Sequence, residues 1–176
     1  MNHIKVIHNA LPTDEYEFLK DVFIDKEQKH NICWHQDFGI AERNTDECNF
    51  NHYMFVHVCF VNGYQPTPSY YKIEPILSKL LDAKQYLRIK ANFYPRTKTI
   101  DKHPWHCDDF RRETGLDVRT ALLSLNTCNG YTAFKDGPKV PSVDNTLILN
   151  PTDVSHMGTS TSNANYRINI NINYLC

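Results

Sequence analysis

The sequence lacks the features of membrane proteins and of secreted, disulfide-bonded proteins. No apolar run is long enough to cross a bilayer, and the first residues do not follow the basic, apolar and small-residue order of a signal peptide. The six cysteines have no paired spacing, so no disulfide framework is indicated. We therefore expect a soluble, intracellular protein that resides in the cytoplasm with reduced thiols and has no membrane partner.

An excess of charge of one sign is also absent. Lys and Arg number 19 against 20 Asp and Glu, so the net charge of -1 gives no general attraction to nucleic acid, and we expect no nucleic-acid partner. The charge is nevertheless uneven, because residues 84 to 119 hold 9 bases and 5 acids. This basic excess suits an anionic substrate or cosubstrate, and an exposed basic surface explains it equally well.

What the sequence contains is enough for one domain, because 176 residues can bury a sizeable core. The first half predicts strands at 3–11 and 49–61, a helix at 14–23, and a second helix that ends near residue 83 and has Pro75 close to its first turn. Residues 25–48 are polar and poorly periodic. From residue 87 onward the pattern predicts short strands, at 87–94, 104–109, 119–126, 131–135, 145–150, 154–158 and 166–174.

This order of elements indicates a mainly β (α+β) fold with N-terminal helices, in which two sheets form a sandwich or jelly roll. We expect a single domain over residues 1–176. Within it, residues 1–84 are predicted to be a helical support region, and residues 85–176 the jelly-roll core that carries the functional site.

A candidate metal site follows from His106 and Asp108. Side chains at positions i and i+2 of an extended strand point to the same face, so these two can hold one ion while Cys107 points away. His156 offers a third ligand near the other end of the chain. Two histidines and one carboxylate on one side of an iron form the facial triad of non-haem Fe(II) oxygenases. The sequence therefore predicts a metal-dependent oxygenase.

Two other sets of residues compete for the metal assignment. His35 and Asp37 form a second His-x-Asp pair, but they precede the strand-rich region, whereas a metal site needs its ligands on a rigid element. Cys33, His35, His57 and Cys59 can be combined into a zinc site, but they lack the usual knuckle spacing. We favour the interpretation that this second set consists of core residues with satisfied hydrogen bonds.

Several motifs follow one another in a specific order along the second half of the chain. A predicted strand ending in Asn-Phe-Tyr-Pro is followed by the His-x-Asp pair, a strand ending in Leu-Asn, Gly-Tyr-Thr-x-Phe, Asn-Thr-Leu-Ile-Leu, and then His156 and Arg167. This order resembles that of the Fe(II)/2-oxoglutarate-dependent dioxygenase superfamily. The chain is most similar to the compact prolyl 4-hydroxylase-like proteins of bacteriophage and bacteria, and a viral origin would place it in the host cytoplasm. The resemblance covers residues 86–176 well and the first half only loosely. It implies a double-stranded β-helix, in agreement with the jelly roll.

The resemblance also implies roles for individual residues. The catalytic metal ligands for Fe(II) would be His106, Asp108 and His156. Arg167 would bind the far carboxylate of the cosubstrate 2-oxoglutarate, since a guanidinium pairs with a carboxylate in a bidentate geometry. Asn169 shares the strand face of Arg167 and is a further candidate for binding the cosubstrate. The remaining candidates share one face of an earlier strand and are Tyr94, Lys90 and Asn92.

Some positions remain open at this stage. Asn171 and Asn173 either face the site or form the solvent-exposed side of an amphipathic strand. The family usually has a tyrosine at the position of Ser124, where it contacts the cosubstrate. His103 is predicted to support the metal ligands or to lie on the surface, and Trp105 is predicted to pack.

The implied reaction is the oxidative decarboxylation of 2-oxoglutarate to succinate and CO2, coupled to hydroxylation of a substrate C–H bond by O2. Ascorbate is a further cofactor that the resemblance allows. The substrate is a peptide or a small molecule, and the resemblance favours peptidyl proline over free amino acids, nucleobases and other metabolites. Loop 109–117, with Arg111 and Arg112, and segment 25–48 are candidate lids. The alternatives are a non-enzymatic viral or sugar-binding jelly roll and a cupin-like metalloenzyme that does not use 2-oxoglutarate. The oligomeric state is left open.

Overall fold

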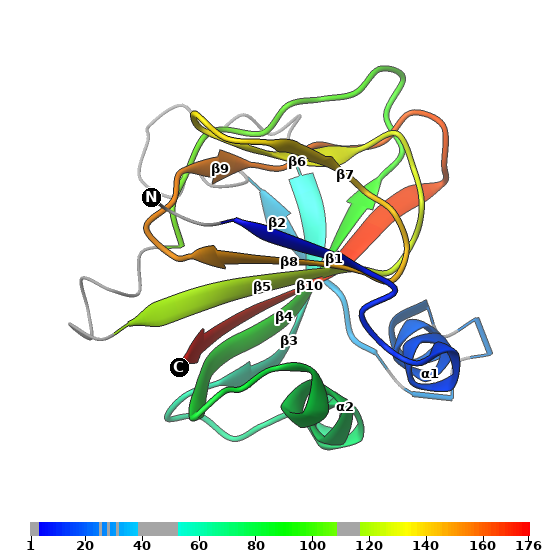
Figure 1. Cartoon of the computed structure of the whole chain (residues 1–176). Helices are drawn as coiled ribbons and strands as arrows, with labels where there is room; N and C mark the ends of the chain where they lie inside the picture. Colours follow the sequence, from blue (N-terminus) through cyan, green and yellow to red (C-terminus); the bar gives the residue numbers. More distant parts are fainter. Residues whose placement is uncertain (1–3, 25, 28, 31, 39–52, 109–116) are drawn as a thin grey trace.

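The structure is a computed structural model, and it describes the whole chain except residues 1–3, 25, 28, 31, 39–52 and 109–116 (Figure 1). The described residues form ten strands and two helices. In chain order they are β1 (Lys5–His8), α1 (Thr13–Ile24), β2 (His35–Phe38), β3 (Tyr53–Val61), α2 (Pro68–Leu80), β4 (Gln85–Pro95), β5 (Val118–Ser124), β6 (Tyr131–Phe134), β7 (Lys139–Pro141), β8 (Thr146–Pro151), β9 (His156–Met157) and β10 (Tyr166–Leu175).

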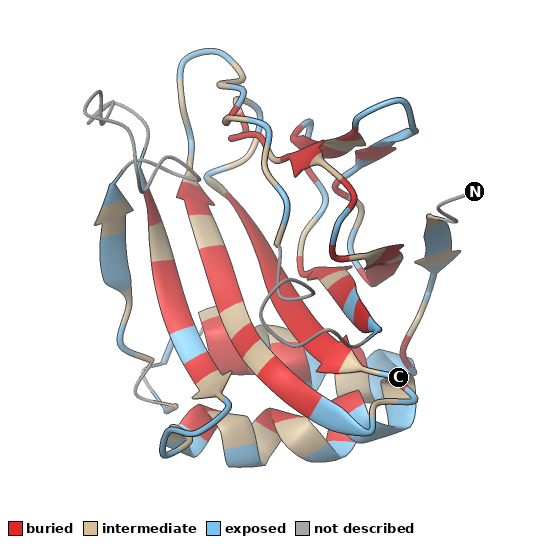
Figure 2. Cartoon of the chain, turned by 90° about the vertical axis from the view of Figure 1, so that its left-hand side faces the viewer, coloured by how far each residue is buried: buried red, intermediate tan, exposed pale blue. Residues whose placement is uncertain are grey.

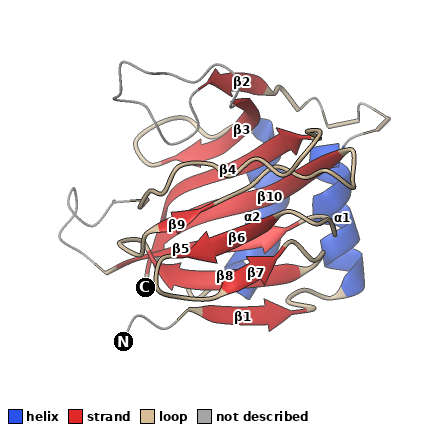
Figure 3. Ribbon diagram, turned by 90° about the horizontal axis from the view of Figure 1, so that it is seen from above, coloured by secondary structure: helices blue, strands red, loops and turns tan. Residues whose placement is uncertain are grey.

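Two antiparallel sheets and a pair of helices form three layers. The larger sheet has seven strands in the order β1-β8-β5-β10-β4-β3-β2, and the smaller sheet has the order β7-β6-β9. Both helices cover one face of the larger sheet, and the smaller sheet lies over its opposite face (Figure 3). The fold is therefore mostly β with two helices, as the sequence predicted.

Strand β10 lies at the centre of the larger sheet, between β5 and β4. Ile168, Ile170 and Ile172 are fully buried in the core that the helices share with the sheet. The alternate side chains of β10 are polar, but they are also buried, because this face is turned toward the smaller sheet. Asn171 and Asn173 are only 6% and 0% exposed, so the solvent-exposed alternative for these two residues is wrong. The red central strands in Figure 2 show this burial.

The helices follow from local sequence. Helix α1 has two acids in its first turn and buries the residues expected from its period, namely Tyr16, Leu19, Val22 and Phe23. Helix α2 begins at Pro68, where the missing N–H has no helical acceptor to lose. As a consequence Pro75 lies in the interior of α2, contrary to the prediction, and the helix ends at Leu80. The burial of Ile73, Ile76 and Leu77 offsets the hydrogen bond that Pro75 removes.

The predicted strand at 104–109 is wrong. Within its described part, residues 104–108, only one bridge pair forms, between His106 and His156. Strands β2 and β7 were not predicted, because each has only three or four residues and shows little alternation. Among the described residues no helix is long and apolar enough to span a membrane.

Candidate metal and cosubstrate site

Three side chains from two distant parts of the chain converge between the sheets. His106 and Asp108 follow β4, and His156 begins β9. One potential ligand atom from each of the three lies within 4.8 Å of the others. The backbones of His106 and His156 exchange two N–H···O hydrogen bonds, of 2.9 and 2.8 Å. Pairing with His156, rather than a regular strand, thus brings the predicted ligands together.

Both imidazole rings are oriented by hydrogen bonds at Nδ1. His106 Nδ1 lies 3.2 Å from the carbonyl oxygen of Pro104, and His156 Nδ1 lies 3.0 Å from that of Val154. Because a carbonyl can only accept, each Nδ1 carries the proton and each Nε2 lone pair is available to a metal. Burial and the neighbouring His156 lower the pKa of His106, so this ring is neutral, as a ligand must be.

Asp108 receives hydrogen bonds from four side chains. Its Oδ1 accepts from Arg88, and its Oδ2 accepts from the side chains of Thr120, Asn171 and Asn173. Burial by itself raises the pKa of this carboxyl, but the positive charges of Arg88 and Lys90, the neighbouring His156 and the bond from Asn173 outweigh it and hold the pKa well below its usual value. The group is therefore an ionised carboxylate at neutral pH. Cys107, between the two ligands, is exposed, and its Sγ donates to the carbonyl of Asp153.

Arg167 is buried in the same interior, with 1% of its surface exposed. Its Nη1 donates to the carbonyl of Thr159 at 3.0 Å, and its Nη2 donates to Oγ1 of Thr132 at 2.8 Å. Its guanidinium carbon lies 5.5 Å from the ring centre of Tyr94. Its Nε has no hydrogen-bond partner and, among the described residues, no carboxylate pairs with it. A buried cation in this state needs an anion, because burial of an unpaired charge costs several kcal/mol, roughly.

Space for the Arg167 side chain depends on Gly130. A Cβ atom on this glycine would lie 2.7 Å from Cδ of Arg167 and 2.6 Å from the carbonyl oxygen of Ser160. Neither contact is tolerated without a shift of the backbone or of the arginine. The glycine of the Gly-Tyr-Thr-x-Phe motif therefore allows the arginine to lie in the interior.

Three solved structures share this architecture. The first is an oxidoreductase of the 2OG-Fe(II) oxygenase family from Burkholderia pseudomallei, with 13% identity and a TM-score of 0.68 over 98% of this chain and 84% of that chain. The second is a prolyl-4-hydroxylase from Pseudomonas putida, with 12% identity and a TM-score of 0.64 over 100% and 94%. The third is a prolyl hydroxylase from Trichoplax adhaerens in complex with a hypoxia inducible factor oxygen degradation domain peptide fragment, with 15% identity and a TM-score of 0.68 over 99% and 84%.

This chain has the fold of the 2OG-Fe(II) oxygenases. No family model and no curated protein matches its sequence, so the likeness lies in the structure. The resemblance predicted from the motifs, including its prolyl 4-hydroxylase-like character, is thus confirmed for the fold.

Within this oxygenase fold the other predicted cosubstrate residues share the interior face. Asn92 donates to Oδ1 of Asn169 at 3.0 Å, and Asn169 lies opposite the buried Ser124 on the neighbouring strand. Lys90 on β4 lies opposite Asn171 on β10, and its positive charge contributes to lowering the pKa of both His106 and Asp108. Ser124, where the resemblance implies a tyrosine, presents only a small side chain to this face.

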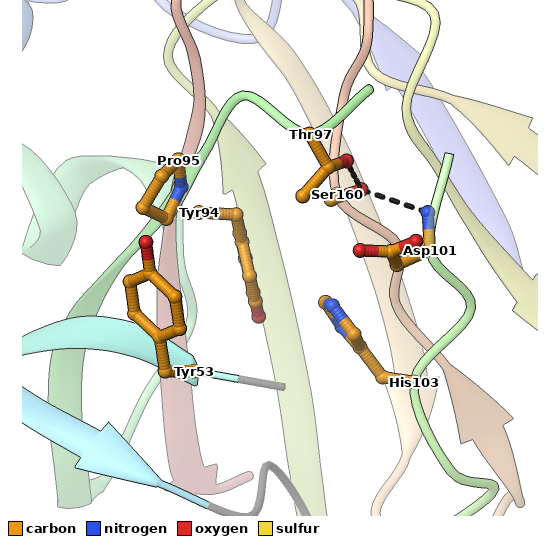
Figure 4. A pocket seen from close by; sticks show the side chains of 7 residues that line it. All are labelled: Tyr53, Tyr94, Pro95, Thr97, Asp101, His103 and Ser160. Atoms are coloured by element: carbon orange, nitrogen blue, oxygen red, sulfur yellow. Dashed lines mark hydrogen bonds between the residues drawn. The ribbon is translucent and has the colours of Figure 1, made fainter. Parts of the chain in front are cut away.

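A small cavity of about 20 Å³ lies beside Tyr94 (Figure 4). Its walls are Tyr53, Tyr94, Pro95, Thr97, Asp101, His103 and Ser160. His103 is buried and stacks on Tyr94 with 5.0 Å between the ring centres, so it supports this wall and does not lie on the surface. Trp105 is 49% exposed, so the prediction that it packs is wrong.

The competing metal sets are not assembled. The described residues contain one cluster of three or more potential ligands within reach of one ion, and it excludes His35 and Asp37. His57 is buried and hydrogen-bonded to Ser69 and to the carbonyl of Cys33, as a satisfied core histidine should be. Cys33 and His35 themselves are exposed, because this segment leads into an edge strand, so the core interpretation is wrong for those two.

Two residues that contact the candidate metal ligand Asp108 were missed by the sequence analysis. Arg88 contacts Asp108 from β4 and Thr120 contacts it from β5, on the two sides of β10, and neither was singled out in the sequence. Strand alternation places Arg88 on the same face as Lys90, Asn92 and Tyr94, and this was the available signal. Arg111, Arg112 and most of the two candidate lids lie outside the described residues.

Proposed function

We propose that this chain is an Fe(II)- and 2-oxoglutarate-dependent dioxygenase that hydroxylates a C–H bond of its substrate and releases succinate and CO2. The observation that carries the proposal is the pairing of two features in one interior. A His, Asp and His cluster lies within reach of one ion, and a buried arginine without a carboxylate partner faces the same space. A bound metal alone would not account for a buried arginine without a carboxylate partner. A bound anion alone would not account for the cluster of two histidines and an aspartate.

The donor set fits Fe(II). His106 and His156 each present a neutral Nε2, and Asp108 presents an ionised carboxylate, which together form the facial donor set of non-haem iron. When bound, the iron would supply the oxidising chemistry that couples O2 to the cosubstrate. The residues present would hold it on one side and leave the other side open.

The dianion 2-oxoglutarate fits the part of the interior where Arg167 lies. Arg167 retains three of its five N–H groups for a carboxylate after its bonds to Thr159 and Thr132. Tyr94 and Asn169 would flank that carboxylate, and Asn92 and Lys90 would line the space toward the metal ligands. The low polarity of a buried site strengthens such charge-assisted bonds and limits access of water to the reacting centre.

We further propose that the two sheets constitute a double-stranded β-helix and that residues 1–176 act as one catalytic domain. Peptidyl proline is the substrate that we favour, with O2 as cosubstrate and with ascorbate as an optional reductant. Two of the three structures described above are prolyl hydroxylases, and one of these is in complex with a peptide. The fold by itself does not select the substrate.

The proposal is tested by an anaerobic titration of the protein with Fe(II) and then 2-oxoglutarate. We expect the visible charge-transfer band of the chelated complex to appear, and to be lost in His156→Ala. His35→Ala is the matched control, since it removes the histidine of the competing His-x-Asp pair and should leave the band intact. Iron binding without the band would favour the cupin-like alternative, and binding of neither ligand would favour a non-enzymatic jelly roll.

A further inference from the structure

The two oxygen atoms of the Asp108 carboxylate are used unequally. Oδ2 accepts from Thr120 at 3.2 Å, from Asn171 at 3.2 Å and from Asn173 at 3.1 Å. Among the described residues, Oδ1 accepts only from Arg88, at 3.2 Å. An ionised carboxylate oxygen offers about two lone-pair sites. Three donors fill Oδ2, so a metal would have to bind at Oδ1, where Arg88 lies.

Arg88 is held in place by its own strand pairing. It lies opposite Asn173 in the β4–β10 pair, and its Nε donates to Oδ1 of Asn173 at 3.1 Å. Its Nη2 makes the ion pair with Asp108. The Arg88 side chain is 23% exposed, whereas that of Asp108 is 7% exposed, so the guanidinium lies on the solvent side of the carboxylate. Arg88 is therefore the partner of this ion pair that solvent reaches more readily.

The four donors therefore have two different physical effects. The hydroxyl and the two amides are neutral and orient the carboxylate, which favours the approach of a metal. Arg88 is positively charged, occupies the oxygen that the metal needs, and repels a divalent ion at close range. In the absence of metal it also compensates the buried negative charge, because an unpaired carboxylate there would be costly.

We infer that Arg88 is an exchangeable counter-ion of Asp108, which a divalent metal displaces from Oδ1, while Thr120, Asn171 and Asn173 are positioning residues that keep Oδ1 directed toward His106 and His156. This inference rests on the proposed function, since it assumes that the triad binds metal. It assigns Arg88 the role of lowering metal affinity and of stabilising the metal-free protein.

The inference predicts effects of opposite sign in two variants. Arg88→Gln removes the competing charge and should tighten metal binding by roughly tenfold or more. Asn173→Ala removes an orienting donor and should weaken it by about 10- to 100-fold, the usual cost of losing such a partner. Arg88→Lys retains the positive charge, so its metal affinity should stay close to that of wild type. Arg119→Gln is the matched control, because it removes the same charge from an exposed arginine that pairs only with Asp117 in the described chain.

The experiment is an anaerobic titration of the full chain with Co(II), without 2-oxoglutarate, followed by its ligand-field absorption bands and by calorimetry. Thermal unfolding of the metal-free and metal-loaded forms accompanies it. We expect Arg88→Gln to be less stable than wild type without metal and to show a larger increase in Tm on loading.

Weaker or unchanged metal affinity in Arg88→Gln would overturn the inference, since it would make Arg88 a positioning or purely structural residue. If that variant does not fold, Arg88→Met and Arg88→Lys decide the sign, because they differ in charge at similar length. If wild type binds neither Co(II) nor Fe(II), the proposed function fails as well. If wild type binds both metal and 2-oxoglutarate but Arg88→Gln does not tighten, the inference fails alone.

Discussion

The substitution Arg167→Ala tests the link between the buried guanidinium and the cosubstrate. Arg167 has three N–H groups left after its bonds to Thr159 and Thr132, including the unpartnered Nε, so it can make a bidentate pair with a carboxylate. Hydrogen bonds to charged groups contribute roughly 1.5–3 kcal/mol each. Part of this is offset by desolvation of the carboxylate, so we expect a loss of ~3 kcal/mol, or about a hundredfold increase in Kd for 2-oxoglutarate.

The assay is an anaerobic titration of Fe(II)-loaded protein with 2-oxoglutarate, in which the charge-transfer band reports occupancy. The Kd of Arg167→Lys for 2-oxoglutarate should lie between those of wild type and Arg167→Ala, because lysine keeps the positive charge but cannot make the bidentate pair of a guanidinium. Arg119→Ala serves as the control for loss of a surface arginine. An unchanged Kd in a folded Arg167→Ala protein with normal iron affinity would refute the reasoning and remove Arg167 from the cosubstrate site.

Three further outcomes are expected. Asp108→Ala should abolish turnover measured as succinate release, whereas full activity would return the assignment to Asp37. Gly130→Ala should lower the free energy of unfolding by about 1–3 kcal/mol and weaken 2-oxoglutarate binding, because its methyl group collides with Arg167; equal stability in chemical denaturation would contradict the close packing. Burial lowers the pKa of His57 below 6.5, so the unfolded chain takes up a proton first as the pH falls, and stability should be lost below about pH 6.5. His57→Gln should show a shallower loss between pH 7 and 5, and an identical pH profile would exclude His57 as a cause.

Local sequence was sufficient for the elements whose pattern is long and periodic. Helix α1 buries the face that its spacing predicts, and β10 shows an unbroken alternation of isoleucine with polar residues. The candidate metal ligands could also be predicted, because a His-x-Asp motif and a later histidine can be recognised directly in the sequence. Short or irregular segments could not be predicted in this way, which is why β2 and β7 were missed and residues 104–109 were wrongly predicted to form a strand.

The sequence by itself determined that β10 has one apolar and one polar face, and which residue types could bind a metal and a carboxylate. Only the tertiary structure decided that the polar face is buried, since a period of two does not say whether solvent or a second sheet meets that face. It also decided the partners of Asp108. Arg88 and Thr120 reach it from β4 and β5, and Asn173 from β10, through strand pairings that join residues up to 85 positions apart. Such contacts depend on the register between strands, which is set by packing of the whole sheet and not by the local sequence of any one strand.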